Sequence, residues 1–178
     1  MVGLPGGGKS TIGRQLARRL RWEFVDTDAA IEKQIGCSIR QYFEQAGESA
    51  FRDVESKVID ALTRMSNAVL ATGGGAVLRE QNRRTLKERC TVVYLRSSPE
   101  ELFRRLRNDT QRPLLQVDDP LAKLRQLHAE RHPLYDEVAH FRVDTGRTSV
   151  ATVVNTIVMQ LDMAQLAHPL PPTGPDLP

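Results

Sequence analysis

The sequence predicts an α/β domain in which a parallel sheet is covered by helices on both faces. Short apolar runs alternate with longer helical segments, which is typical of such sheets. Four of the runs, at residues 22–26, 68–72, 91–95 and 140–145, are expected to be buried strands. Near the C-terminus one segment has the helical period, since its apolar residues share one face: Val150, Val153, Val154, Ile157, Val158 and Leu161.

The composition limits the class of protein. With 178 residues, 40% hydrophobic and 26% charged, the chain suits one soluble domain over residues 1–165. No apolar run approaches the roughly 20 residues that span a bilayer, so no membrane partner is expected. The net charge of +3 comes from basic residues scattered among acidic ones, which does not favour nucleic-acid binding. The proline-rich residues 166–178 are expected to form a poorly ordered tail.

The strongest motif stands at the start of the chain. Residues 3–10 read GLPGGGKS and fit the phosphate-binding pattern G-x-x-x-x-G-K-[ST]. Backbone N–H groups and the N-terminus of the following helix would hold phosphate oxygens, Lys9 would reach the β- and γ-phosphates, and Ser10 would offer its hydroxyl to magnesium. The motif predicts that a nucleoside triphosphate binds with Mg²⁺ through Gly6, Gly7, Gly8, Lys9, Ser10 and Thr11.

The motif begins unusually early. A phosphate-binding loop normally follows a central buried strand, yet only Met1 and Val2 precede Gly3. Either that strand is nearly absent, or the natural start of translation lies upstream. A missing central strand would remove hydrogen bonds and core area, so a chain that begins at Met1 is expected to be poorly stable.

Two candidate acids, Asp26 and Asp28, follow the strand at 22–26. Carboxylates at i and i+2 of an extended segment point the same way. One could therefore support magnesium while the other accepts a hydrogen bond from a substrate hydroxyl. The alternative is that either residue caps a helix. No N-K-x-D stretch is present, so a GTPase is not favoured.

Six motifs, in order, resemble those of shikimate kinases. They are GLPGGGKST (3–11), DTD (26–28), FRDVE (51–55), GGGAVL (73–78), RPLL (112–115) and RHPLYDEVA (131–139). The resemblance runs from Gly3 to about Leu161. It implies a three-layer P-loop kinase fold with a parallel sheet of about five strands, a substrate-binding insert near 28–60 and a lid near 107–120.

The resemblance also implies a reaction. Shikimate kinases transfer the γ-phosphoryl group of ATP to the 3-hydroxyl of shikimate, a step of chorismate and aromatic amino acid biosynthesis, with Mg²⁺ as cofactor. We therefore expect ATP and shikimate as substrates of a cytoplasmic monomer. Two cysteines without disulfide or metal-ligand spacing suit that reducing compartment.

Residue by residue, the family pattern implies that Asp28 contacts the ring hydroxyls and is the candidate base. Asp26 and Ser10 are then the expected magnesium ligands. Arg52 and Arg131 would clamp the substrate carboxylate with planar, permanently charged forks. The alternative for both arginines is structural pairing with Asp53, Glu55 or Glu130. Gly74 and Gly75 would contact shikimate, unless they form a plain turn.

Three further arginines complete the implied nucleotide site. Arg112, in the lid, would neutralise charge on the transferring phosphoryl group and help to exclude water. Arg105 would stack on adenine with Arg147 on its far side, although a solvated helix face is the alternative for Arg105. The pair His128 and His132 lacks the spacing and third ligand of a zinc site.

Two other functions compete with this interpretation. Another small-molecule kinase, such as one for gluconate, would share the loop and the lid but lack the Asp28, Arg52 and Arg131 constellation. A non-catalytic nucleotide-binding regulator is disfavoured, because the substrate-side residues are all present.

Overall fold

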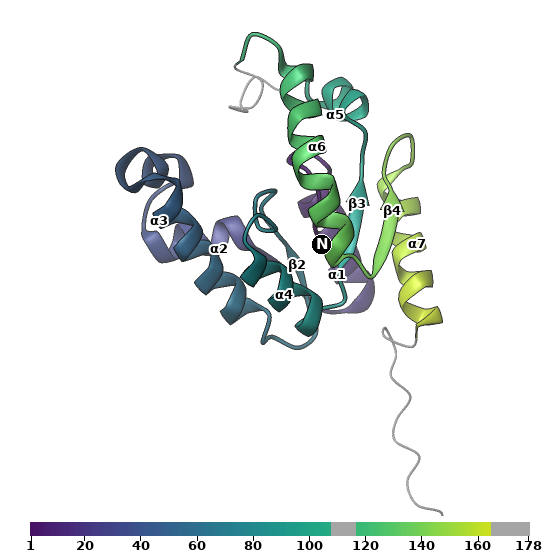
Figure 1. The fold of residues 1–178 in the computed structure, drawn as a ribbon. Coiled ribbons are helices and arrows are strands. Elements are labelled where there is room, and N and C mark those ends of the chain that lie inside the picture. The colour runs from purple at the N-terminus through teal and green to yellow at the C-terminus, as the bar shows by residue number, and fades with distance from the viewer. Residues whose placement is uncertain (108–116, 165–178) are drawn as a thin grey trace, which may run out of the picture.

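The structure is a computed structural model that describes residues 1–107 and 117–164. The strands are β1 (Glu23–Asp26), β2 (Ala68–Ala71), β3 (Val93–Arg96) and β4 (Phe141–Asp144). The helices are α1 (Lys9–Leu20), α2 (Thr27–Ile35), α3 (Ile39–Leu62), α4 (Glu80–Arg89), α5 (Pro99–Leu106), α6 (Pro120–Val138) and α7 (Val150–Met163). The alternation of strands and helices confirms the predicted α/β class (Figure 1).

Val2 takes the central position of the sheet, between the parallel pairs β1–β2 and β3–β4. Its N–H donates to the Val93 carbonyl, and its carbonyl accepts from the Leu95 N–H, both at 3.0 Å. On the other side the Met1 carbonyl accepts from the Thr72 N–H at 3.2 Å. Within residues 1–107 and 117–164, four strands and this short bridge stand where about five strands were predicted.

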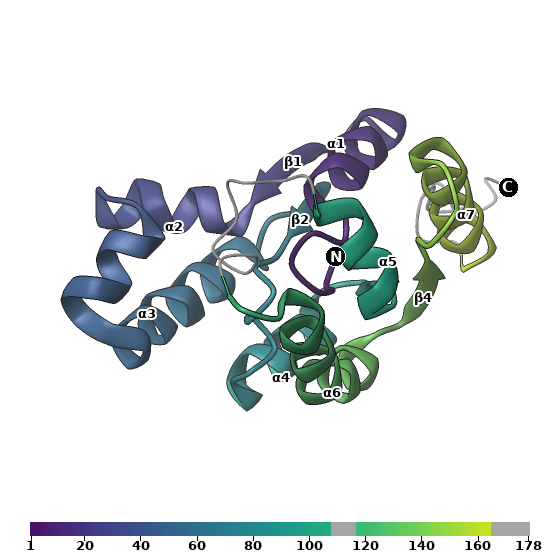
Figure 2. The same ribbon diagram turned by 90° about the horizontal axis from the view of Figure 1, so that it is seen from above.

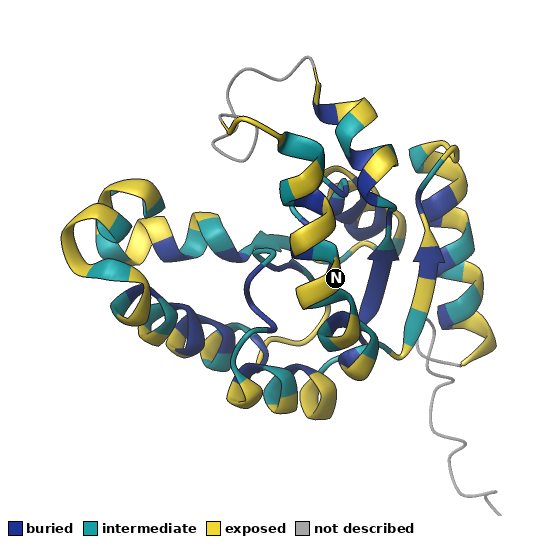
Figure 3. Cartoon of the chain, turned by 45° about the horizontal axis from the view of Figure 1, so that its top comes forward, coloured by how far each residue is buried: buried dark blue, intermediate teal, exposed yellow. Residues whose placement is uncertain are grey.

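The sheet separates two hydrophobic cores. Val93 and Leu95 pack with α1 and α7, whereas Val92 and Tyr94 pack with α4, α5 and α6. This alternation follows from the two-residue period of a strand. Figure 3 shows β3 buried along its length, as expected for a parallel strand covered on both faces. The predicted layers of helix, sheet and helix are thereby confirmed.

The predicted insert near 28–60 corresponds to α2 and α3, which project from one side of the molecule, away from α7 (Figure 2). Ser38 begins α3 with a capping box that it forms with Gln41. Gly47, at φ 82°, bends α3 into two segments. A small separate core of Ile31, Phe51 and Val58 holds the insert together.

Two predicted segments fall largely outside the described residues. Residues 108–116 of the lid and all of 166–178 are not among them. The strand expected at 91–95 lies at 93–96, because Val92 turns its N–H to the His140 ring at 3.0 Å instead of to a neighbouring strand. Within residues 1–107 and 117–164, no helix combines the length and apolar character needed to cross a bilayer.

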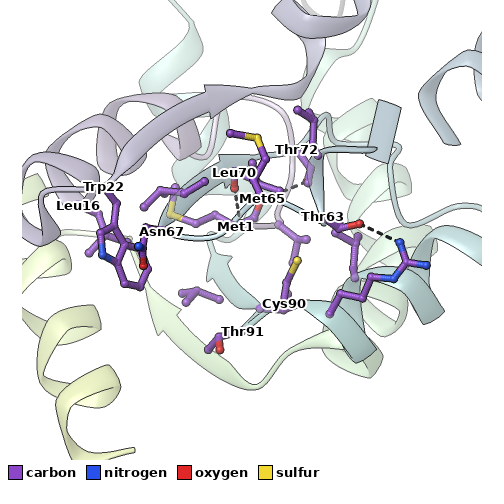
Figure 4. A pocket seen from close by; sticks show the side chains of 18 of the residues that line it. Met1, Leu16, Trp22, Thr63, Met65, Asn67, Leu70, Thr72, Cys90 and Thr91 are labelled. Atoms are coloured by element: carbon purple, nitrogen blue, oxygen red, sulfur yellow. Dashed lines mark hydrogen bonds between the residues drawn. The ribbon is translucent and has the colours of Figure 1, made fainter. Parts of the chain in front are cut away.

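An apolar groove of about 230 Å³ lies between β2 and β3, at the end of the sheet opposite the phosphate loop (Figure 4). Met1 reaches into it, and its amino group donates to the Leu70 carbonyl at 2.6 Å. Burial lowers the pKa of this amino group to about 6. The N–H and C=O of a strand residue point to the same side, so the N–H groups of Leu70 and Val93 face the groove as well. None of the predicted site residues that the structure describes lines the groove, although Thr72 lines both the groove and the cavity beside the phosphate loop.

Candidate active site

The phosphate loop joins the central bridge of the sheet to α1. Gly8 is the N-cap of α1 at φ 87°, a left-handed conformation that favours glycine, and no side chain caps the helix. The first N–H groups of α1 are therefore open toward an adjoining cavity of about 270 Å³. The cavity is lined by Pro5, Gly6, Gly8, Lys9, Ser10, Thr11, Asp26, Asp28, Thr72, Gly73 and Gly74. Gly7 is not in that lining, since its N–H donates back to the Leu4 carbonyl at 3.1 Å.

The Lys9 side chain folds back over the loop. Its ammonium donates to the carbonyls of Gly3 at 2.8 Å and Leu4 at 2.9 Å, and only 8% of the residue is exposed. The two carbonyls hold the Lys9 ammonium beside the phosphate loop. Charged phosphate oxygens would be stronger acceptors for this ammonium than the neutral carbonyls are. Contact of Lys9 with the β- and γ-phosphates stays a prediction.

Ser10 and Asp26 form the pair of oxygen ligands that the sequence predicts for magnesium. The Ser10 hydroxyl donates to Asp26 Oδ2 at 2.8 Å. The other carboxylate oxygen, Oδ1, accepts from the N–H groups of Asp28 at 3.0 Å and Ala29 at 3.3 Å, so Asp26 also caps α2. Hydroxyl and carboxylate oxygens suit Mg²⁺, which completes its shell with water and phosphate oxygens. Asp26 can therefore cap the helix with one carboxylate oxygen while the other is available to a metal ion, so the two predicted roles are compatible.

Asp28 lies in the first turn of α2. The premise that Asp26 and Asp28 share one extended segment is wrong, because capping by Asp26 turns the chain into a helix at Thr27. Both side chains nevertheless line the same cavity. Burial raises the pKa of Asp28 to about 6, with further contributions from the negative charges of Asp26 and Glu55. A carboxyl with that pKa can take and release a proton near neutral pH.

Arg52, on α3, lies against the glycine loop that follows β2. A Cβ on Gly75 would come within 2.5 Å of both terminal nitrogens of the guanidinium, so only glycine allows this approach. One nitrogen donates to Glu55 Oε2 at 2.7 Å and the other to Glu48 Oε1 at 3.3 Å. Arg52 Nε is buried without a hydrogen-bond partner. The expected alternative of structural pairing with Glu55 is thus present, but it leaves donor capacity unused.

Arg131 lies on α6, one helical turn before Tyr135. Its Nε is also buried without a hydrogen-bond partner, and no ion pair of Arg131 occurs among residues 1–107 and 117–164. The Tyr135 hydroxyl donates to the Gly74 carbonyl at 2.6 Å. Arg52 therefore lies against Gly75 itself, whereas Arg131, from a different helix, neighbours the tyrosine that holds Gly74.

Two of the three arginines expected at the nucleotide lie in or against the loop after β4, and the third is outside the described residues. Arg105 donates to the carbonyls of Thr145 and Gly146, at 2.7 Å for the latter, and so ties α5 to the loop after β4. Arg147 is exposed in that loop. Arg112 lies outside the described residues. Stacking of Arg105 on adenine remains a prediction, and the observed role of its guanidinium is to hold this loop.

The two histidines of α6 make contacts of another kind. The rings of His128 and His132 stack with centroids 4.9 Å apart, and His132 Nδ1 lies 2.9 Å from the Tyr94 hydroxyl. Among the described residues, no group of three or more His, Cys, Asp or Glu side chains could hold a metal ion.

Two residues of the site have no functional role in the sequence-based prediction, which includes Glu55 only as a possible structural partner of the arginines and does not include Tyr135. Glu55 is a buried acid, 1% exposed, that orients Arg52, and Tyr135 holds the glycine loop. Both could have been found from helical spacing, because Glu55 stands three residues after Arg52 and Tyr135 stands four after Arg131.

A parallel sheet, a phosphate loop at its carboxyl edge, and a helical insert beside that loop define a P-loop kinase. The sequence matches the family model of shikimate kinase over residues 5–162. The chain belongs to the shikimate kinase family.

Individual relatives agree with this assignment. The chain is 55% identical to the shikimate kinase of Paracidovorax citrulli, with 96% of this chain and 95% of the relative covered. It is 51% identical to that of Ralstonia nicotianae, with 98% and 92% covered. Among solved structures, Acinetobacter baumannii shikimate kinase in complex with shikimate gives a TM-score of 0.87 at 43% identity, covering 93% and 92% of the two chains. A Sinorhizobium meliloti gluconokinase, at 18% identity and TM-score 0.63, shares the fold.

Proposed function

We propose that the protein transfers the γ-phosphoryl group of ATP to the 3-hydroxyl of shikimate. The observation that carries this proposal is a pair of arginines, Arg52 and Arg131, with buried, unpartnered Nε atoms. Arg52 lies against Gly75, and Arg131 neighbours Tyr135, which holds Gly74 in the lining of the cavity beside the phosphate loop. Buried donors without partners are costly, and a substrate carboxylate would satisfy them with charge-assisted hydrogen bonds. Membership of the family and the shikimate bound to the Acinetobacter baumannii relative support the same substrate.

Each residue then has a chemical task. Ser10 and Asp26 would hold Mg²⁺, which supplies charge neutralisation between the phosphates. Lys9 would exchange its loop carbonyls for phosphate oxygens, and Asp28 would accept the proton of the attacking hydroxyl. Arg52, Arg131, Gly74 and Gly75 would orient the acid so that this hydroxyl faces the γ-phosphate.

The nucleotide is proposed to extend from the loop toward Arg105 and Arg147. Arg112 is proposed to enter the site from the lid and to neutralise charge on the transferring group. The catalysis would consist of positioning and charge stabilisation, with no covalent intermediate on the protein. We further propose that the enzyme acts in the cytoplasm as a monomer, in the pathway to chorismate.

Three alanine variants test the division of tasks. Arg52→Ala and Arg131→Ala should weaken shikimate binding at least tenfold, about the effect of one charge-assisted hydrogen bond, with little change in ATP affinity. Lys9→Ala should mainly reduce kcat. Arg40→Ala, which removes an exposed arginine of α3, is the control. Isothermal titration with each ligand and steady-state kinetics measure both effects, and equal loss of shikimate affinity in all three variants would contradict the proposed roles.

A further inference from the structure

Tyr135 connects α6 to the glycine loop through one short hydrogen bond. Its hydroxyl donates to the Gly74 carbonyl at 2.6 Å, and the residue is 0% exposed. Its ring packs at 5.2 Å from that of Tyr94, so the side chain has little freedom to move. The Gly74 carbonyl therefore has a fixed direction.

The direction of that carbonyl determines the direction of the next N–H group. The peptide bond between Gly74 and Gly75 is planar and trans, so the Gly75 N–H points opposite to the Gly74 carbonyl, away from Tyr135. No hydrogen bond within residues 1–107 and 117–164 uses this N–H. The guanidinium of Arg52 lies against the Cα of Gly75. The Gly75 N–H, which has no partner among the described residues, and the Arg52 guanidinium are thus held close together.

Tyr135 also contacts the second arginine. The Arg131 guanidinium lies beside the Tyr135 hydroxyl, and burial raises the pKa of that hydroxyl above its ordinary value despite the nearby positive charge. Tyr135 is therefore a neutral donor throughout the working range. One side chain thus touches both Arg131 and the peptide that carries the Gly75 N–H.

We infer that Tyr135 is a positioning residue for the acid substrate, which it serves by aiming the Gly75 N–H into the same subsite as Arg52 and Arg131. The inference rests on the proposed function, since it concerns the binding of the same acid. Tyr135 does not touch the reacting atoms, so its effect is on substrate affinity and orientation. Its hydrogen bond does not involve Lys9, Ser10 or Asp26, although Gly74 packs against Pro5 of the phosphate loop.

Tyr135→Phe tests this inference, with Tyr94→Phe as the matched control. Both variants remove one hydroxyl from adjacent, fully buried tyrosines, but only the first releases the glycine loop, since the Tyr94 hydroxyl contacts His132. Tyr135→Phe should raise the KM and Kd for shikimate about tenfold, the order of one lost hydrogen bond, and leave the KM for ATP within twofold. Tyr94→Phe should leave both within twofold.

The possible outcomes separate the two hypotheses. A wild-type protein that neither binds nor phosphorylates shikimate refutes the proposed function. Wild-type activity combined with unchanged shikimate affinity in Tyr135→Phe, or with equal losses in both variants, refutes the role of Tyr135.

Amide hydrogen exchange in the wild-type protein gives a second test that does not depend on folding of a variant. Shikimate should slow exchange at Gly75, and an unchanged rate there would overturn the inference.

Discussion

Replacing Asp28 by asparagine removes one negative charge from the cleft while nearly preserving the shape of the side chain. Burial, followed by the charges of Asp26 and Glu55, raises the pKa of Asp28 from 3.8 to about 6. Each pKa unit corresponds to about 1.4 kcal/mol. At pH 8 the ionised carboxylate therefore lowers the free energy of unfolding by about 3 kcal/mol.

The sign of the pH dependence follows from the raised pKa. Below about pH 4 Asp28 is protonated in both the folded and the unfolded state, and its destabilising effect vanishes. The effect grows as the pH rises from about 4 to 6, because the unfolded chain loses its proton first, and it is constant above that range. Asp28→Asn should therefore raise the free energy of unfolding by about 3 kcal/mol at pH 8 and by about half as much at pH 5.

Urea unfolding of both proteins at the two pH values measures this difference, since shared titrations cancel in the comparison. Glu88→Gln, which removes an exposed carboxylate of α4, is the control and should change stability little at either pH. The same Asp28→Asn protein should lose about 100-fold or more in kcat, as expected for removal of a general base. A variant that is no more stable than wild type at pH 8, or equally stabilised at both pH values, would refute the reasoning.

Three further changes have defined outcomes. Gly75→Ala places a methyl group 2.5 Å from the guanidinium nitrogens of Arg52 and should weaken shikimate binding more than tenfold by calorimetry while ATP binding is kept; unchanged shikimate affinity would contradict the contact. Ser10→Ala removes one of the two proposed Mg²⁺ ligands and should raise the free Mg²⁺ needed for half-maximal turnover about tenfold, whereas an unaltered Mg²⁺ dependence would exclude Ser10 from the metal site. An apolar tripeptide joined ahead of Met1 should fill the groove between β2 and β3 and raise the melting temperature by about 5 °C over a Gly-Ser-Gly extension, and equal melting temperatures would show that the groove does not take it.

The sequence predicts the strands and the phosphate loop well because their signals are local. An apolar run such as residues 68–71 favours a strand that is at least half-buried, and the spacing from Gly3 to Ser10 describes one continuous segment of backbone. The central strand could not be predicted in its observed form. A two-residue bridge at Val2 depends on acceptors and donors supplied by β2 and β3, which no local pattern contains.

The site shows the same division between local and tertiary information. Ser10 and Asp26, both expected at the metal, form a hydrogen bond, since the loop and the first strand end at one edge of the sheet; their binding of Mg²⁺ stays a prediction. The position of Asp28 was derived from an extended segment that does not exist, because the cap formed by Asp26 outweighs strand continuation. The bond from Tyr135 to Gly74 joins residues 61 positions apart and became visible only in the folded chain.

The most direct test of the proposed function is a coupled assay of ADP release with ATP and Mg²⁺, run in parallel with shikimate and with gluconate. Turnover that depends on shikimate and yields a shikimate phosphate, with none on gluconate, is the result that we predict. Turnover on gluconate instead, or ATP binding without turnover on either acid, would contradict it.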